Sequence, residues 1–405
     1  MAPRYSYTDT TTDIPAVSDA IYNIDFNEAG LLQLLGFSSA NLKKFAVRAG
    51  WPSTTLTWLE DVNVPKTTLL AESGFDDTET DLTVSTGTGK YFRKGDILGI
   101  YANAAGTGPI AEKFLVTAQS TDVLTIVRGY GGTSGASHTN GMFIRLLTRA
   151  NEENSLYTTE HMTTPTAVSN YTQILDASVE MSETEALMSR YGIDDHMDMQ
   201  IGKLFDDGGA EGRLAQLLHE TFYYGEPVVR AASPEYGSMG GFNAFVTTST
   251  ASTSHVVDLD GIAFQLKDIY GVMRAIRNSG SGARATHLIA NSWALEKMSQ
   301  FWDDKLQISV KELRVPGHPE LTEVMTPHGK LRLVYDWMCP QDEMYFVNVE
   351  KCGWVPYRDF KRKMIYGGAQ NNPYDGRVEQ VIGEYTFGLA NPKSFGRIHD
   401  FSITS

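Results

Sequence analysis

The sequence predicts an α+β fold in which a larger body carries a small all-β insertion domain. Residues 71–150 form an island of strand-like sequence, the stretch 183–225 is helical, and helices alternate with strands after residue 240. Inside the island, residues 81–85 and 112–117 alternate between apolar and polar side chains, as half-buried strands do. We therefore expect one β-domain inserted in a loop of a larger fold.

The N-terminal part predicts an arm, a short helix and a strand. The first 20 residues are rich in Thr, Asp and Ser, which is typical of an extended or loosely ordered arm. Residues 27–28 then favour the start of a short helix through the leucines of 31–35. Residues 51–61 predict a strand with Leu56 and Trp58 on one face.

The island itself predicts a small antiparallel barrel or sandwich. Candidate strands begin near residues 81, 95, 112, 122 and 141, and short strands at this spacing are typical of such folds. Glycine-rich turns separate them at 87–89, 106–109 and 128–135. The apolar run 123–127 predicts a buried strand.

Residues 151–182 predict the return from the island to the body. This segment is polar, and its pattern is strand-like near 171–179. We expect it to run beside the strand 51–61 that led into the island. The island would then lie at the tip of a two-stranded arm.

The helical stretch contains a change of apolar phase. At about 100° per residue, the apolar side chains of 201–205 lie on one arc, whereas those of 214–218 centre more than a third of a turn away. Either Gly208 and Gly209 break or bend the helix, or its two halves are covered by different neighbours. We therefore name this glycine pair as a candidate hinge.

After residue 240 the pattern predicts an α+β body. Asp258 or Asp260 is expected to cap a helix whose apolar face runs from Ile262 through Leu266 and Tyr270 to Ile276. Asn291 is expected to cap a second helix that ends near Phe301. The predicted strands of this part are 286–289, 330–337, 344–349 and 378–389.

Composition limits the classes of protein that remain. The chain has 405 residues, of which 41% are hydrophobic, so it can build a substantial core. Its 34 basic and 49 acidic residues give a net charge of 34 − 49 = −15, which disfavours general binding to nucleic acid. The two cysteines form no disulfide framework, which fits a reducing compartment. No apolar run reaches the ~18 residues of a membrane span, and the polar start does not resemble a signal sequence, so we expect a soluble protein made in a cytoplasm.

Motifs for phosphate binding and hydrolysis are absent from the sequence. The segment 87–90 lacks the upstream glycine of a phosphate loop, and we interpret it as a hairpin turn. Gly106, Gly108 and Ala111 fit a dinucleotide fingerprint, but no helix follows, so a turn is again the interpretation. The sequence also contains no HExxH and no GxSxG motif.

Several histidine and carboxylate pairs are spaced as metal ligands can be. His196 and Asp198 form an HxD pair that Asp194 and Asp195 precede, but carboxylates there also suit the positive end of a helix. The other pairs, which we interpret as capping or solvated pairs, are His255 with Asp258 and His318 with Glu320. Cys339 and Cys352 have no histidine at zinc-ligand spacing. We expect no catalytic residue, no cofactor and no bound metal.

The order of these elements resembles the major capsid protein of tailed phages, which has the Hong Kong 97-type shell fold. The more specific segments are 17–21 (VSDAI) and 57–61 (TWLED) in the arm, with 92–97 (FRKGDI) and 125–133 (TIVRGYGGT) in the island. They resemble the branch of the family whose extended loop carries an inserted β-barrel. The closing segment 383–398 is similar to the last strands of the peripheral domain.

The resemblance implies a complete division of the chain into domains. The expected segments are an N-terminal arm with the first limb of the extended loop (1–65), the β-barrel insertion (66–150), the return limb (151–182), the spine helix with part of the peripheral domain (183–238), the axial domain (239–370) and the closing strands (371–405).

The resemblance also implies a structural function. We expect a non-catalytic shell protein that binds copies of itself as pentamers and hexamers, encloses double-stranded DNA without reading its sequence and does not bind a membrane. Portal, scaffold and decoration proteins are candidate partners, and the virion is the expected location, after assembly in the host cytoplasm. The alternatives are an encapsulin-like compartment shell and a tail-associated or carbohydrate-binding β-protein.

Overall fold

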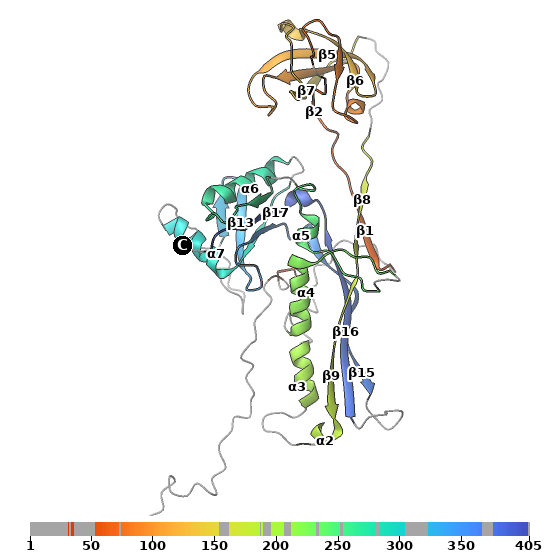
Figure 1. Ribbon diagram of the computed structural model, residues 1–405, viewed down its shortest axis with the longest axis vertical. Helices are drawn as coiled ribbons and strands as arrows, with labels where there is room; N and C mark the ends of the chain where they lie inside the picture. The colour runs from red at the N-terminus through yellow and green to blue at the C-terminus, as the bar shows by residue number, and fades with distance from the viewer. Residues whose placement is uncertain are drawn as a thin grey trace, which may run out of the picture. The chain divides into compact units, whose positions relative to one another are not determined.

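The computed structural model divides the chain into two compact units (Figure 1). It describes residues 31, 34–35, 53–72, 74–153, 162–186, 188, 196–205, 212–231, 235–251, 254–279, 283–303, 323–366 and 376–403. One unit, here called the small unit, spans Leu59–Ala167, and the large unit combines Met1–Trp58 with Val168–Ser405. Within the described ranges, no helix is long and apolar enough to cross a membrane.

The small unit is a six-stranded antiparallel sheet. The order of its strands is β2-β7-β4-β5-β6-β3. Their bounds are Thr67–Leu69 (β2), Asp81–Thr83 (β3), Asp96–Tyr101 (β4), Ile110–Ser120 (β5), Val123–Val127 (β6) and Phe143–Arg149 (β7). A bridge between Leu70 and Val84 joins the two outer strands, so the sheet closes on itself. The all-β prediction for this region is confirmed, although the three-residue strand β2 was missed.

The core of the small unit comes entirely from its own residues. It contains Leu70, Phe75, Leu82, Val84, Phe92, Leu98, Ile100, Phe114, Val116, Leu124, Ile126 and Ile144. In β6 only Leu124 and Ile126 are buried, whereas Val123 and Val127 are 36% and 48% exposed. The prediction of a buried strand is therefore wrong here, because an antiparallel sheet can bury one face and leave the other in water.

Two predicted turns have different outcomes. The segment 87–90 is a turn but not a hairpin, because β3 pairs with β6 while β4 pairs with β5 and β7. Its Gly87 and Gly89 N–H groups donate to the carboxylate of Asp122, at 2.9 and 3.0 Å. The turn that contains Gly106 and Gly108 connects the paired strands β4 and β5, as predicted.

The large unit contains three sheets (Figure 1). Strand β1 (Thr55–Glu60) pairs with β8 (Thr166–Tyr171), and Leu56 and Trp58 are buried as expected. A three-stranded antiparallel sheet has the order β15-β16-β9, with bounds Cys352–Tyr366, Gly376–Leu389 and Gln173–Ser182. A six-stranded mixed sheet has the order β10 (Val256–Asp258), β17 (Gly396–His399), β14 (Met344–Val347), β11 (His287–Ala290), β13 (Gly329–Tyr335) and β12 (Glu323–Thr326).

The helices of the large unit differ from the prediction of one long helix. They are α2 (Glu183–Ala186), α3 (His196–Leu204), α4 (Arg213–Tyr224), α5 (Phe242–Phe245), α6 (Leu266–Asn278) and α7 (Ser292–Asp303). Helix α3 ends at Leu204, nine residues before Arg213, where α4 begins, and both lie beside the three-stranded sheet in Figure 1. Gly208 and Gly209 lie outside the described residues, so the hinge stays a prediction.

The cap of α6 was predicted wrongly. Gln265 caps the helix in a capping box with Asp268, whereas Asp258 ends β10 and Ile262 is 65% exposed. The helix cannot begin at Asp260 because that residue and Gly261 have positive φ values of 48° and 73°. The buried face of α6 otherwise includes Ile269, Met273 and Ile276, as expected.

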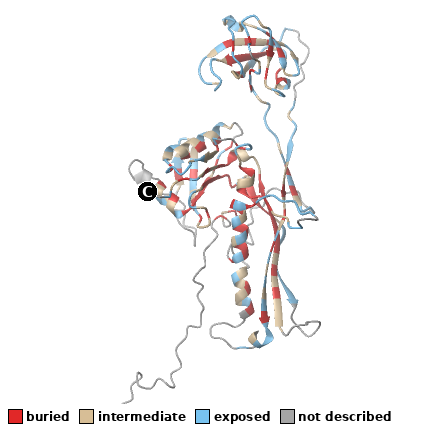
Figure 2. Cartoon of the chain, viewed as in Figure 1, coloured by how far each residue is buried: buried red, intermediate tan, exposed pale blue. Residues whose placement is uncertain are grey.

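The large unit has two hydrophobic cores, which appear as buried segments in Figure 2. One lies around α4, α5 and the three-stranded sheet, where the ring of Phe222 contacts those of Phe242 and Phe387 at centroid distances of 5.5 and 5.4 Å. The other is formed by residues of α6, α7 and the six-stranded sheet. In α4 the predicted apolar residue Leu217 is 38% exposed, and His219 takes a buried place instead.

Candidate assembly surfaces

A buried cluster of hydrogen-bonded polar side chains connects α4 to the six-stranded sheet. His219 and Tyr223 lie one turn apart on α4, and both bind Oδ2 of Asp336, the residue that follows β13. The His219 and Asp336 side chains are 0% exposed, so a substrate cannot reach them. Burial raises the pKa of Tyr223, and burial also raises the pKa of the nearby Cys339 thiol, which keeps both groups protonated.

This cluster was not predicted, although one signal was available. His219 and Tyr223 are four residues apart on the apolar face of a helix, where polar groups need a buried partner. The partner is 117 residues from His219 in the chain, so sequence spacing could not identify it. We assign the cluster a structural role.

The outer half of β15 forms the first exposed surface suited to protein contacts. β15 is an edge strand, and residues 361–365 are exposed on both faces. Met364 and Ile365 are 49% and 40% exposed, and Lys361 and Lys363 form no ion pair with any described residue. An edge strand presents unpaired backbone groups to which a further chain can bind. This edge therefore offers backbone, apolar and cationic contacts in a chain that is acidic overall.

Buried Glu379 on β16 supports this edge. Arg362 and Arg377 both form ion pairs with its carboxylate. Burial by itself would raise the pKa of Glu379, but the two guanidinium groups outweigh it and lower the pKa. Arg362 also pairs with Asp198 on α3. The cationic side of β15 is thus linked to both neighbouring elements.

A second exposed surface is the hairpin loop that follows α4. Val228 pairs with Ser238, and Val229 and Tyr236 are 52% and 86% exposed. The base of the loop is closed by the Gly241 N–H, which donates to the Gly225 carbonyl at 2.8 Å. A large apolar side chain that is held out into water in this way is typical of a protein interface.

A third set of exposed apolar side chains lies near the end of β1 and on the segments that adjoin β1 and β8. Leu59 in β1 is 70% exposed, Val62 is 59% exposed, and Met162 is 89% exposed. Together, the three surfaces can bind other protein chains.

Three of the candidate metal-site residues that the structure describes have other neighbours. Asp198 pairs with Arg362, and the Asp258 carboxylate lies 4.0 Å from His399. His255 is buried with its Nδ1 3.2 Å from the Phe395 carbonyl, and burial lowers its pKa. The remaining members, Asp194, Asp195, His318 and Glu320, lie outside the described residues. In the part of the chain that the structure describes, no group of three or more His, Cys, Asp or Glu could hold a metal.

These surfaces and this fold define a structural assembly protein. The chain belongs to the SU10 major capsid protein family, whose model matches residues 4–402. It is therefore a capsid protein, as the sequence resemblance predicted.

Solved structures agree with this fold. The capsid of an empty GTA particle has a TM-score of 0.52 at 10% identity, and the match covers 99% of this chain and 100% of that chain. The capsid of a native GTA particle has a TM-score of 0.51, with the same identity and coverage. The encapsulin of Synechococcus elongatus has a TM-score of 0.38 at 8% identity, and that match covers 60% of this chain and 79% of that chain. No curated protein matches this chain. The α+β fold of the Hong Kong 97 type is confirmed, whereas the branch with an inserted β-barrel stays a prediction.

Proposed function

We propose that this capsid protein assembles as pentamers and hexamers into the closed icosahedral or prolate head shell of a tailed double-stranded DNA phage. The observation that carries the proposal is the family match over residues 4–402. The three exposed apolar surfaces support it, because such surfaces are costly in water and are stabilised when a neighbouring copy covers them. Identical contacts repeated around rotation axes produce closed assemblies.

The expected product is a closed particle of megadalton mass. Sedimentation and negative-stain images of virions, or of the chain expressed with its phage partners, should show shells of uniform size. The reason is that repeated contacts between copies bury the three exposed surfaces. Monomers or dimers as the only species in the native source would contradict the proposal.

The content of the particle separates this function from that of an encapsulin-like compartment. We propose that the shell encloses double-stranded DNA in the virion and is assembled in the host cytoplasm, with portal, scaffold and decoration proteins as further partners. The net charge of −15 supports this function, because an acidic shell does not bind the negatively charged DNA phosphates tightly. Nuclease-protected double-stranded DNA in purified particles is the outcome expected of a phage head, and a protein cargo is the outcome expected of a compartment.

The domain assignments also belong to this proposal. We assign 239–370 to the axial domain, with 183–238 and 371–405 in the peripheral domain, 1–65 and 151–182 in the arm and the limbs of the extended loop, and 66–150 as an inserted module. The support for the module is that its hydrophobic core uses its own residues alone.

The inserted module is expected to fold by itself. A segment comprising residues 66–152 should show dispersed amide signals and a cooperative melt, because its sheet closes through its own bridge between Leu70 and Val84. Stability should be modest at this size. An unfolded amide spectrum at 10 °C and at 25 °C would contradict independent folding.

A further inference from the structure

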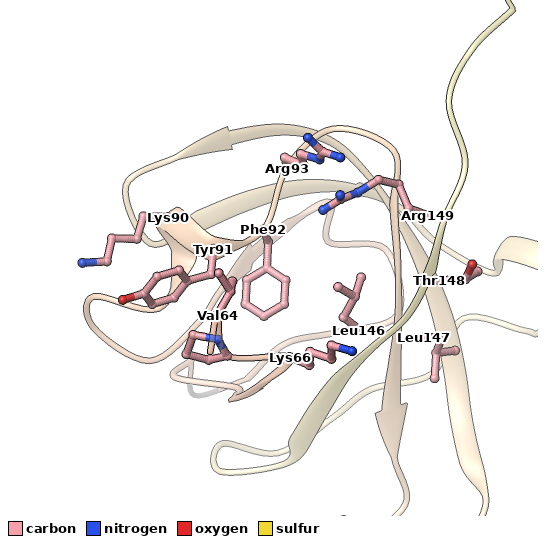
Figure 3. A pocket seen from close by; sticks show the side chains of 11 residues that line it. Val64, Lys66, Lys90, Tyr91, Phe92, Arg93, Leu146, Leu147, Thr148 and Arg149 are labelled. Atoms are coloured by element: carbon pink, nitrogen blue, oxygen red, sulfur yellow. The ribbon is translucent and has the colours of Figure 1, made fainter. Parts of the chain in front are cut away.

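The small unit contains a cationic pocket. The pocket has a volume of about 390 Å³, and four of the residues that line it are Lys66, Lys90, Arg93 and Arg149. Figure 3 shows Phe92 and Leu146 facing each other across the pocket. Arg93 and Arg149 lie together on one side of this pair, and Lys66 and Lys90 lie apart from each other on its other sides. A pocket of this size, with apolar walls and a few charged groups, is typical of a binding site.

Charge is unevenly distributed over the small unit. Residues 59–167 contain eight Lys or Arg and thirteen Asp or Glu, and four of the eight cations line the pocket whereas none of the thirteen acids does. Buried Asp96 accepts hydrogen bonds from the Arg149 side chain and from the Arg93 N–H, which fixes this side of the pocket. Lys66 and Lys90 form no ion pair within the described residues. The pocket is therefore open to an anionic partner.

A surface of opposite charge lies on residues 76–81, here called the acidic loop. It contains Asp76, Asp77, Glu79 and Asp81 in six positions. The Asp76 carboxylate accepts hydrogen bonds from the Thr78 and Glu79 N–H groups at 2.8 Å, which fixes the shape of the loop. Burial raises the pKa of Glu79, and the nearby charges of Glu72 and Asp76 raise it further. The carboxylates thus repel one another and would be stabilised by added cations.

The pocket and the acidic loop are separate surfaces of the small unit. Arg149, which lines the pocket, ends β7 and pairs with Asp96 at the start of β4. The acidic loop instead leads into β3, whose first residue Asp81 pairs with Thr125 in the middle of β6. No residue of the acidic loop lines the pocket.

We propose that the acidic loop of one copy docks against the cationic pocket of the small unit of a neighbouring copy. The inference rests on the proposed shell function and names a contact within it. The occupant is a second copy of this chain, because the same unit carries both a surface lined by cations and an exposed cluster of carboxylates. A contact between two different surfaces of identical subunits is head-to-tail, and such contacts form a ring where the rotation between neighbours closes.

Charge reversal on the full chain tests this contact. Lys66→Glu with Lys90→Glu, or Asp77→Lys with Asp81→Lys, should each raise the protein concentration needed for shell formation about tenfold, because each change turns attraction into repulsion. The chain with all four changes should return to near the wild-type value. A matched control is Lys113→Glu with Arg145→Glu, which changes the net charge equally but lies outside the pocket and should assemble normally.

Light scattering against protein concentration, at low and at high salt, gives the readout. If the contact exists, the chain with all four changes should assemble like the wild type. The assembly defects of the two double variants should be larger at low salt than at high salt. Normal assembly of the Lys66→Glu, Lys90→Glu chain would overturn the inference, as would failure of the four-change chain to recover. If Lys66→Glu with Lys90→Glu impairs assembly but Asp77→Lys with Asp81→Lys does not, another acidic segment occupies the pocket. That result would also overturn the inference. Absence of particles when the wild-type chain is expressed with its phage partners would instead overturn the proposed shell function.

Discussion

Replacement of Glu112 by alanine is expected to destabilise the small unit by about 3–5 kcal/mol, because it leaves a buried guanidinium without its counter-charge. Glu112 is fully buried and binds Arg128 through two hydrogen bonds of 3.0 and 2.7 Å. The Arg128 side chain is only 9% exposed and lies over the ring of Phe75, 4.4 Å from its centroid. The loss would be a large share of the roughly 5–15 kcal/mol that stabilises a typical domain.

Denaturant unfolding with hydrogen exchange at amides of the small unit would measure this loss. Glu152→Ala is the matched control, because Glu152 is 69% exposed and its ion pair among the described residues is with exposed Lys94. Its expected cost is under about 1 kcal/mol. Equal stabilities of the Glu112 and Glu152 variants would contradict the importance of the buried pair.

The same carboxylate predicts a dependence on pH. Burial tends to raise the pKa of Glu112, but the Arg128 side chain, the Ala136 and Gly129 N–H groups and His138 together lower it below its usual 4.5. A lowered pKa in the folded state adds stability that is complete above the usual value and is lost as the pH falls through the lowered value. The wild-type small unit should therefore lose stability below about pH 4, and the Glu112→Gln variant should lose less. An identical pH profile for the two would contradict this assignment.

Replacement of Gly212 by alanine is expected to disrupt the junction between α3 and α4. Gly212 has a φ of +96°, which strains any residue with a side chain. A Cβ atom there would lie 2.8 Å from the Leu204 carbonyl oxygen and 3.0 Å from Cα of Phe205, so backbone would have to move. We expect a cost of about 2–4 kcal/mol and a lower yield of shells. Thermal unfolding of the unassembled chain and particle counts measure the two effects.

Gly202 provides the matched control for this substitution. It lies within α3, has no atom within 4 Å of its added Cβ and has no positive φ. Gly202→Ala should therefore be neutral or stabilise the chain by up to about 1 kcal/mol. A Gly212→Ala chain as stable as the Gly202→Ala chain would contradict the strain at the junction.

The Gly208→Ala, Gly209→Ala double variant tests the predicted hinge. Stalled assembly of this variant would support the hinge, and a normal particle yield would eliminate it.

Local patterns in the sequence were sufficient for the fold class and for most elements. Alternation placed Leu82, Val84, Phe114 and Val116 in the core, and the 3.6-residue period placed the buried face of α6. These signals work because each residue's face depends on its own neighbours along the strand or helix. The same patterns, with the order of the elements, predicted the capsid family that the comparison confirms.

The long hairpin strand β15 was missed for a physical reason. Residues 361–365 are exposed on both faces, so they carry no alternation for a pattern to detect. Strand β2 was missed because its residues 67–69 (TTL) do not alternate between polar and apolar side chains, whereas β3 begins the alternating segment 81–85. The break between α3 and α4 was suspected from the apolar phase, but the strained Gly212 was not identified, because a glycine permits a positive φ without requiring one.

Only the tertiary structure decided the buried polar contacts and the placement of charge. Alternation alone put Glu112 on the same face as Phe114, yet it could not supply Arg128, which reaches the carboxylate from the end of another strand. Asp336 likewise meets His219 across 117 residues. The four cations of the pocket come from three separate segments, at residues 66, 90–93 and 149, which only the fold brings together. The sequence by itself determined most of the strands and helices and most of the buried faces, because these depend on near neighbours in the chain. Partners distant in the chain depend instead on how the strands are ordered and paired.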